Sequence, residues 1–182
     1  MGVSLADSLD AANAPQHRIG LKWPNDLWLI QNKTEQKLGG ILVETATLEG
    51  QRYVVMGVGI NVRAFEMTLH ESTAIAPNCL QNLQPTADVA GTLLRVLAPL
   101  VQTVQAFEAF GFAPFQARFD VRDVLAGRQA VLSDGTHGQA HGVTPLGALL
   151  VHTSAGMKEI TSSEVSVRPA TGSAPGAGFS RC

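Results

Sequence analysis

The sequence has little charge, few cysteines and no long apolar run. Only 15% of its 182 residues are charged, and 13 lysines and arginines against 15 aspartates and glutamates give a net charge of -2. This balance argues against a dedicated nucleic-acid or anionic-membrane binder, because such proteins carry a strongly basic face. The two cysteines, Cys79 and Cys182, are far apart, so neither a disulfide framework nor a zinc site is expected.

Signals for secretion or membrane insertion are also missing from the sequence. The longest apolar stretches fall short of the roughly 18 residues that a membrane span needs. No basic segment followed by an apolar one marks a secretory signal at the start. We therefore expect a cytoplasmic protein without membrane contact, with enough hydrophobic residues (45%) for about one domain plus an appendage.

The spacing of apolar residues predicts where helices and strands lie. A helix is expected over residues 3–13, and a longer one over residues 89–104, in which Pro99 should kink or divide the helix and Gly111 should end it. Short strands meeting at hairpin turns are expected in two groups. The first group comprises residues 19–22, 27–30, 38–44 and 53–62. The second, which suits a small barrel, comprises residues 130–133, 136–143, 148–152, 157–160 and 164–167.

Two short runs early in the chain could carry charge-dependent chemistry. A tight turn at residues 22–27 brings together Lys22, Asn25 and Asp26. The lysine could bind a phosphate, the amide could recognise polar groups, and the carboxylate could bind a metal or a ribose. The plain alternative is a turn with an incidental lysine. At residues 37–44, Lys37 precedes two glycines at the start of an apolar strand, which fits either an anion site or a β-bulge with a solvated lysine.

A third run, at residues 57–62, alternates glycine with apolar residues. Gly57 and Gly59 on a strand leave one face open for a flat ligand, and Asn61 ends the run with an amide. A twisted strand packed against a helix explains the same glycines. The run is not a dinucleotide fingerprint, since it lacks the third glycine and the helix that should follow.

Taken together and in this order, the three runs resemble the motifs of the biotin–protein ligase family, also called biotin–[acetyl-CoA-carboxylase] ligases. The matching runs are Lys-Trp-Pro-Asn-Asp, Lys-Leu-Gly-Gly-Ile-Leu-Val-Glu and Gly-Val-Gly-Ile-Asn-Val. The resemblance covers about residues 2–168. It implies an α+β fold with a mixed or antiparallel sheet and helices, similar to a class II aminoacyl-tRNA synthetase-like catalytic domain, over residues 1–122. A small SH3-like β-barrel would follow over residues 123–168, and a disordered tail over residues 169–182.

The resemblance also implies an activity. Such ligases activate the carboxylate of biotin with ATP and magnesium, giving biotinyl-5′-adenylate, and pass biotin to a lysine of the biotin carboxyl carrier protein of acetyl-CoA carboxylase or a similar carboxylase. By this resemblance Lys37 is the catalytic residue. The implied biotin-binding residues are Lys37, Gly39, Gly40, Ile41, Gly57 and Gly59. The implied nucleotide-binding residues are Lys22, Asn25, Asp26, Asn61 and Arg168, with Asp26 also a magnesium ligand; Arg168 could equally be a plain exposed arginine.

Part of the family pattern has no counterpart in this sequence. The family carries an upstream loop rich in arginine and glycine, whereas no two arginines are adjacent here, and the winged helix that binds DNA in some members is absent. We expect a C-terminal part of a ligase that binds no nucleic acid, binds biotin weakly and does not biotinylate a carrier alone. An exposed helix face near Leu5 and Leu9 is expected as well. A non-catalytic interaction module with a vestigial ligand site is the alternative, and a homodimer stays open.

Overall fold

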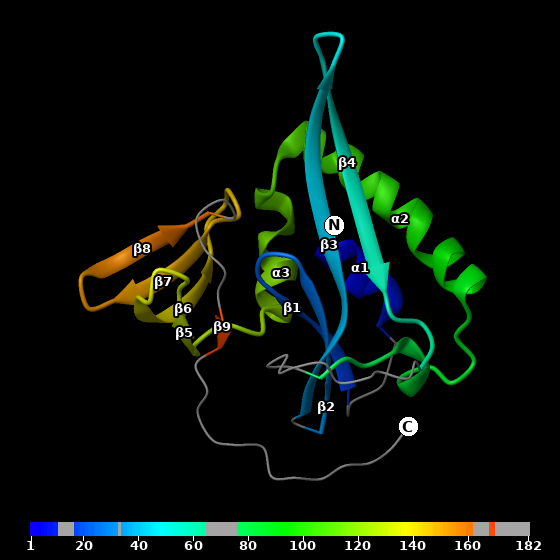
Figure 1. The fold of residues 1–182 in the computed structure, drawn as a ribbon, viewed down its shortest axis with the longest axis horizontal. Coiled ribbons are helices and arrows are strands. Elements are labelled where there is room, and N and C mark those ends of the chain that lie inside the picture. The colour runs from blue at the N-terminus through cyan, green and yellow to red at the C-terminus, as the bar shows by residue number, and fades with distance from the viewer. Residues whose placement is uncertain (11–16, 33, 65–75, 162–167, 170–182) are drawn as a thin grey trace. The chain divides into compact units, whose positions relative to one another are not determined.

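The chain folds into two compact units, Met1–Ala109 and Phe110–Cys182, which are described separately. The computed structural model describes residues 1–10, 17–32, 34–64, 76–161 and 168–169 (Figure 1). Both units contain an antiparallel sheet together with helices, in agreement with the expected α+β class. The boundaries expected at residues 122 and 168 stay predictions.

The first unit contains a four-stranded antiparallel sheet in the order β1-β2-β3-β4. The strands are β1 (His17–Lys22), β2 (Asp26–Gln31), β3 (Thr34–Leu48) and β4 (Gln51–Ile60). Glu49 and Gly50 join the last two strands with φ values of 52° and 78°, the left-handed conformation that two-residue hairpin turns require. The expected hairpin is therefore confirmed, although both of its strands begin earlier than predicted and β3 also ends later (Figure 1).

Helix α1 (Gly2–Leu9) packs on one face of this sheet. Leu5 and Leu9 are fully buried, together with sheet residues such as Ile19 and Leu27. The expectation that these two leucines lie on an exposed helix face was therefore wrong, because the unit's own sheet covers them. The helix is confirmed up to Leu9; residues 11–13 of the predicted helix lie outside the described part of the chain.

Helix α2 (Val89–Phe110) follows a short 3-10 turn, η1 (Leu80–Asn82). Asp88 caps it by accepting a hydrogen bond from the Gly91 amide at 2.8 Å, and Gly111 follows it with a φ of 69°. Pro99 lies inside the helix without dividing it: the proline removes one hydrogen bond, and the ladder continues on both sides. The alternative, a kink at Pro99, stays a prediction.

The surface of α2 is unusually apolar. Seven of its large apolar side chains are exposed: Val89, Leu93, Leu94, Leu97, Val101, Phe107 and Phe110. By length and composition alone this 22-residue helix could cross a membrane. A single helix of this kind is weak evidence for a membrane protein.

The second unit contains a five-stranded antiparallel sheet in the order β8-β7-β6-β5-β9. Its elements are η2 (Ala113–Phe115), α3 (Gln116–Arg122), β5 (Gln129–Val131), β6 (His137–Val143), β7 (Leu149–Thr153), β8 (Gly156–Ile160) and β9 (Arg168–Pro169). The first four predicted strands of this group are confirmed. The fifth was predicted at residues 164–167, which lie outside the described residues, as does the tail from residue 170.

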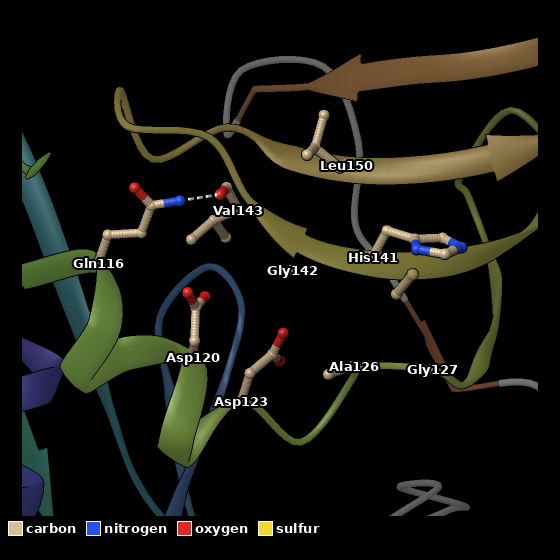
Figure 2. A pocket seen from close by; sticks show the side chains of 10 residues that line it. Gln116, Asp120, Asp123, Ala126, Gly127, His141, Gly142, Val143 and Leu150 are labelled. Atoms are coloured by element: carbon tan, nitrogen blue, oxygen red, sulfur yellow. Dashed lines mark hydrogen bonds between the residues drawn. The ribbon is translucent and has the colours of Figure 1, made fainter.

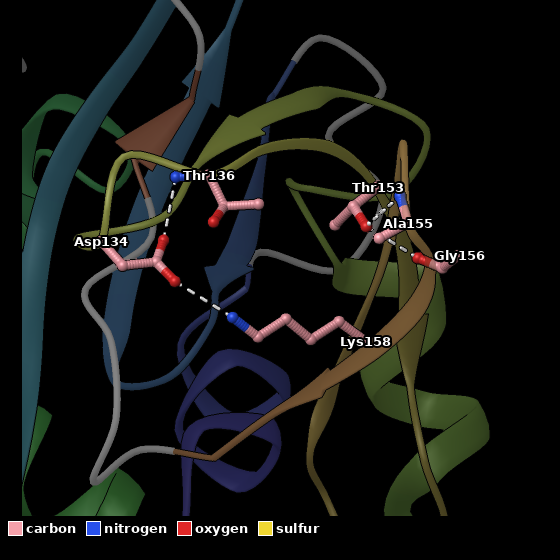
Figure 3. Close-up of polar contacts among 6 residues, drawn as sticks. All are labelled: Asp134, Thr136, Thr153, Ala155, Gly156 and Lys158. Carbon is pink, nitrogen blue, oxygen red and sulfur yellow. Dashed lines mark hydrogen bonds and ion pairs between the residues drawn. The ribbon is translucent and has the colours of Figure 1, made fainter.

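A polar contact ties the β5–β6 turn to strand β8 (Figure 3). Asp134 accepts a hydrogen bond from the Thr136 amide at 2.9 Å and forms an ion pair with Lys158 at 3.0 Å. The hydrogen bonds from the Thr136 backbone and side chain, followed by the contact with Lys158, lower the pKa of Asp134 to about 2. The carboxylate therefore stays ionised throughout the neutral range.

Candidate functional site

A β-bulge in β3 determines which way Lys37 points. Gly39 pairs with Leu27 across the sheet, whereas Lys37 pairs with Trp28, so Leu38 is an extra residue between them. Side chains alternate between the two faces of a strand, and one inserted residue reverses the alternation. Lys37 consequently projects from the face opposite to that of Gly39. The β-bulge that was predicted as the alternative to an anion site is present, and it changes the direction in which Lys37 points.

Lys37 meets a carboxylate on this face. Its ammonium lies 2.7 Å from one oxygen of Asp26, while the ammonium of Lys22 lies 3.8 Å from the other. Asp26 thus sits between two lysines, and the cluster carries one more positive than negative charge. The Lys37 side chain is 47% exposed, so an anion from solvent can reach it.

Three glycines make a flat surface beside this cluster. Directly opposed residues in antiparallel strands project from the same face, and the register aligns Asp26 with Gly40 and Gly40 with Gly59. Gly57, two residues before Gly59, projects from the same face. We call Gly40, Gly57 and Gly59 the glycine shelf.

A methyl group fits at each position of the shelf. A Cβ built on Gly40 would lie 3.5 Å from an Asp26 oxygen and 3.7 Å from the Lys37 ammonium, which is ordinary contact distance. On Gly57 and Gly59 the nearest atoms would be 3.7 and 3.9 Å away. Each of these positions therefore has room for a methyl group, so steric fit within the fold does not require glycine there.

Gly39 and Ile41 project from the other face of the sheet. A Cβ on Gly39 would lie 2.2 Å from the Gly59 carbonyl oxygen, so the close approach of the strands requires glycine there. The Ile41 side chain lies near Gly2 of α1, and its amide donates to the Asn25 carbonyl at 2.9 Å. The structure therefore separates these two predicted biotin contacts from the shelf.

A loop that the sequence did not single out holds the backbone of Lys37. The Lys37 amide donates to the Ala76 carbonyl at 2.9 Å, and its carbonyl accepts from the Asn78 amide at 2.8 Å. The buried Asn78 side chain donates to the Gln36 side-chain oxygen at 2.7 Å and accepts from the Cys79 amide at 2.6 Å. No sequence pattern pointed to Asn78, because Gln36 is remote in sequence and its nearby partners, the Cys79 amide and the Asn82 side chain, form no recognisable motif.

The remaining predicted nucleotide residues are spread between the two units. Asn61 uses its side-chain amide to donate to the Asn78 carbonyl at 3.1 Å, so it secures the same loop. Asn25 is exposed in the turn before β2. Arg168 lies in β9 of the second unit, where its backbone pairs with Val131. A role of Arg168 in nucleotide binding stays a prediction.

The described residues do not by themselves form a magnesium site. They contain no group of three acidic, histidine or cysteine side chains able to hold a metal, and both carboxylate oxygens of Asp26 face lysine ammoniums. Mg²⁺ usually takes one or two carboxylates together with phosphate oxygens and water. A resident magnesium ion does not fit Asp26 in this arrangement.

Comparison with known proteins gives consistent results over most of the chain. The family model described as "Biotin protein ligase C terminal domain" matches residues 131–168. Biotin–[acetyl-CoA-carboxylase] ligase of Paracoccus denitrificans is 31% identical over 169 residues, 90% of this chain and 69% of that protein. Bifunctional ligase/repressor BirA of Escherichia coli is 30% identical over 177 residues, 93% of this chain and 52% of that protein.

Solved structures agree with these relatives. Biotin protein ligase from Aquifex aeolicus has a TM-score of 0.75 and 27% identity, covering 93% of this chain and 72% of that one. The structure of the same ligase in complex with biotin and ATP gives a TM-score of 0.74. The chain thus spans about two thirds of the Paracoccus protein and about half of BirA.

Proposed function

This chain belongs to the biotin protein ligase family, and from that membership we propose that it takes part in the ATP-dependent attachment of biotin to a lysine of a biotin carboxyl carrier protein. One observation carries the proposal. The bulge at Leu38 directs Lys37 onto the face of the glycine shelf, beside Asp26. A flat apolar ring system can lie on such a surface while its carboxylate meets an ammonium.

The chemistry asks mainly for positioning and charge neutralisation. In the first step a carboxylate oxygen of biotin attacks the α-phosphorus of ATP, and pyrophosphate leaves. Two anions repel each other until a cation lies between them. Lys37 supplies that cation, and Asp26 holds its ammonium at 2.7 Å until the substrates arrive. In the second step the carrier lysine attacks the carbonyl carbon of the mixed anhydride, and AMP leaves.

The finer assignments belong to the same proposal. Lys22, Asn25 and Asp26 would serve the nucleotide, Asn61 would act by holding the loop around Asn78, and Gly39 and Ile41 would contribute through their backbone. The synthetase-like fold of the catalytic part, the SH3-like barrel of the C-terminal part, magnesium supplied with ATP, and the cytoplasmic location are also proposed from the family.

A second candidate function rests on a different observation. Large apolar side chains are exposed on α2 and on the outer half of the β3–β4 hairpin, including Leu48, Tyr53 and Val54. Exposed apolar surface of this extent is typical of an interaction site. A non-catalytic module that binds a partner protein would use this surface and retain the glycine shelf without activity.

Biotin-dependent exchange of pyrophosphate into ATP separates the two functions. The assay is run on the 182-residue chain and on the longest open reading frame that contains it. We expect exchange from the longer product and weak activity from the chain alone. Lys37→Ala should reduce exchange, whereas Lys158→Ala should not, since Lys158 has a similar ion pair and exposure (44%) in the second unit. Absence of exchange from both forms would favour the interaction module.

A further inference from the structure

The second unit contains a pocket that the proposed ligase chemistry does not use. Its volume is about 480 Å³, and it lies between helix α3 and strands β6 and β7 (Figure 2). Gln116 closes one end by donating its side-chain amide to the Val143 carbonyl at 2.7 Å. The other walls include Asp120, Asp123, Ala126, Ala140, His141 and Leu150.

Asp123 brings an incompletely satisfied carboxylate to this pocket. Its side chain is more than nine-tenths buried, and one oxygen accepts the Leu125 amide at 2.8 Å. The other oxygen is buried and has no hydrogen-bond partner among the described residues. The pKa of Asp123 is raised above its ordinary value, mainly by burial and to a smaller extent by the nearby charge of Asp120. A buried acceptor without a donor is costly, so this site favours a ligand that supplies N–H groups.

Asp120 adds a second carboxylate one helical turn away. Asp123 follows the last residue of α3 and lies three positions after Asp120, and Figure 2 shows the Asp120 carboxylate pointing into the same space. Among the described residues no ion pair neutralises either carboxylate. Arg128 acts on Asp123 only as the weakest of several influences on its pKa. Two neighbouring carboxylates without a counter-charge favour the binding of a cation.

The surroundings indicate which kind of cation fits. The described part of the chain offers no group of three side chains able to hold a metal ion. The pocket instead combines its carboxylates with apolar walls from Ala126, Val143 and Leu150. An ammonium or guanidinium at the end of an aliphatic stem matches both features, because its N–H groups bind carboxylates and its stem packs on apolar surface.

We propose that this pocket binds an aliphatic ammonium or guanidinium group, carried by a free amine or by a protein side chain, with its N–H groups on Asp120 and Asp123. The stem lies along Val143 and Leu150. The residues of this site all belong to the second unit and none of them forms the shelf or the Lys37 cluster, so the proposal does not depend on the ligase function.

An NMR titration of the 182-residue chain tests the site with three probes. Agmatine represents a free amine, N-acetyl-arginine amide represents a protein side chain, and butylurea is a neutral control. We expect saturable shifts of the Asp120, Asp123 and Gly142 amides with at least one cationic probe, and none with butylurea. If agmatine binds and the arginine amide does not, the ligand of the pocket is a free amine. Binding of the arginine amide extends the site to protein side chains.

Two variants with the same chemical change make the test specific. Asp120→Asn removes a charge from an exposed residue of the pocket and should weaken binding of the cationic probe about tenfold. Asp134→Asn removes an exposed charge elsewhere in the same unit and should leave binding unchanged. The proposal is overturned if neither cation shows saturable shifts up to about 10 mM. It is also overturned if butylurea binds equally well or if both variants weaken binding alike.

Discussion

Replacing Gly59 by alanine tests whether the glycine shelf exists for a ligand or for the fold. The added Cβ would lie 3.9 Å from its nearest neighbour, the Gly40 carbonyl oxygen, so the folded chain has room for it. Glycine inside a strand is about 0.5–1 kcal/mol less stable than alanine. At about 2–4 °C per kcal/mol for a chain of this length, Gly59→Ala should raise Tm by about 1–4 °C.

Gly39→Ala is the matched control on the neighbouring strand. Its Cβ would lie 2.2 Å from the Gly59 carbonyl oxygen, so the backbone must move. Overpacking of this kind costs about 1–3 kcal/mol, which lowers Tm by about 2–12 °C on the same scale. The same chemical change at positions on opposite faces should therefore shift stability in opposite directions, as measured by differential scanning calorimetry.

Biotin affinity supplies the functional half of this prediction. A methyl group on Gly59 fills the gap in which a ring system would lie, and should weaken biotin binding at least tenfold, or about 1.4 kcal/mol. Isothermal titration calorimetry measures this on the form that is active in the exchange assay. A Gly59→Ala variant that binds biotin as tightly as the wild type would refute the ligand role of the shelf. A variant that melts as low as Gly39→Ala would refute the steric reasoning.

Three further predictions concern single side chains. Lys37→Ala should lower adenylate formation by about 10²–10³-fold and change Tm by less than about 4 °C, because exposed ion pairs contribute about 0–1 kcal/mol; a large loss of Tm with full activity would make Lys37 structural. Asn78→Ala leaves buried polar groups without partners, at about 1–3 kcal/mol, so calorimetry should show a clearly lower Tm; an unchanged Tm would contradict the loop's anchoring role. Asp123→Asn should raise Tm at neutral pH. The pKa of Asp123 in the folded chain is raised above the ordinary 3.8, so its charged form lowers the free energy of unfolding at pH values above that folded pKa. Below about pH 3.8 the carboxyl is protonated in both the folded and the unfolded chain, and the cost disappears. An equal gain at about pH 3 would contradict that sign.

Local patterns in the sequence predicted most of the strands. The turns at Glu49-Gly50 and Asp134-Gly135 each place a glycine at positive φ, which glycine adopts readily, and strands flank both turns as expected, although the bounds of β3 and β4 differ from the predicted ones. The helix beginning near Val89 was also predictable, since its apolar residues recur at helical spacing. Whether the helix continues through Pro99 or divides there could not be decided from the sequence, because one proline removes a single hydrogen bond from a helix of 22 residues.

Long-range contacts account for what the sequence could not reveal. Asn78 binds Gln36, which is 42 residues away, and no local pattern marks such a pair. The burial of Leu5 and Leu9 depends on the sheet of the same unit, which the sequence reading had not placed beside them. The motif residues were predicted together, but which of them share a face follows only from the register of three strands.

The bulge at Leu38 explains how a buried core residue and an exposed lysine can be neighbours in one strand. Leu38 is fully buried, while Lys37, its immediate neighbour, is about half exposed on the shelf face. A regular strand would have placed Lys37 on the same face as Gly39 and Ile41, against helix α1, where an unpaired ammonium is costly. The extra residue therefore anchors the strand through Leu38 and turns the lysine toward Asp26. The backbone thereby sets the position of Lys37, so its side chain can serve a ligand instead of the fold.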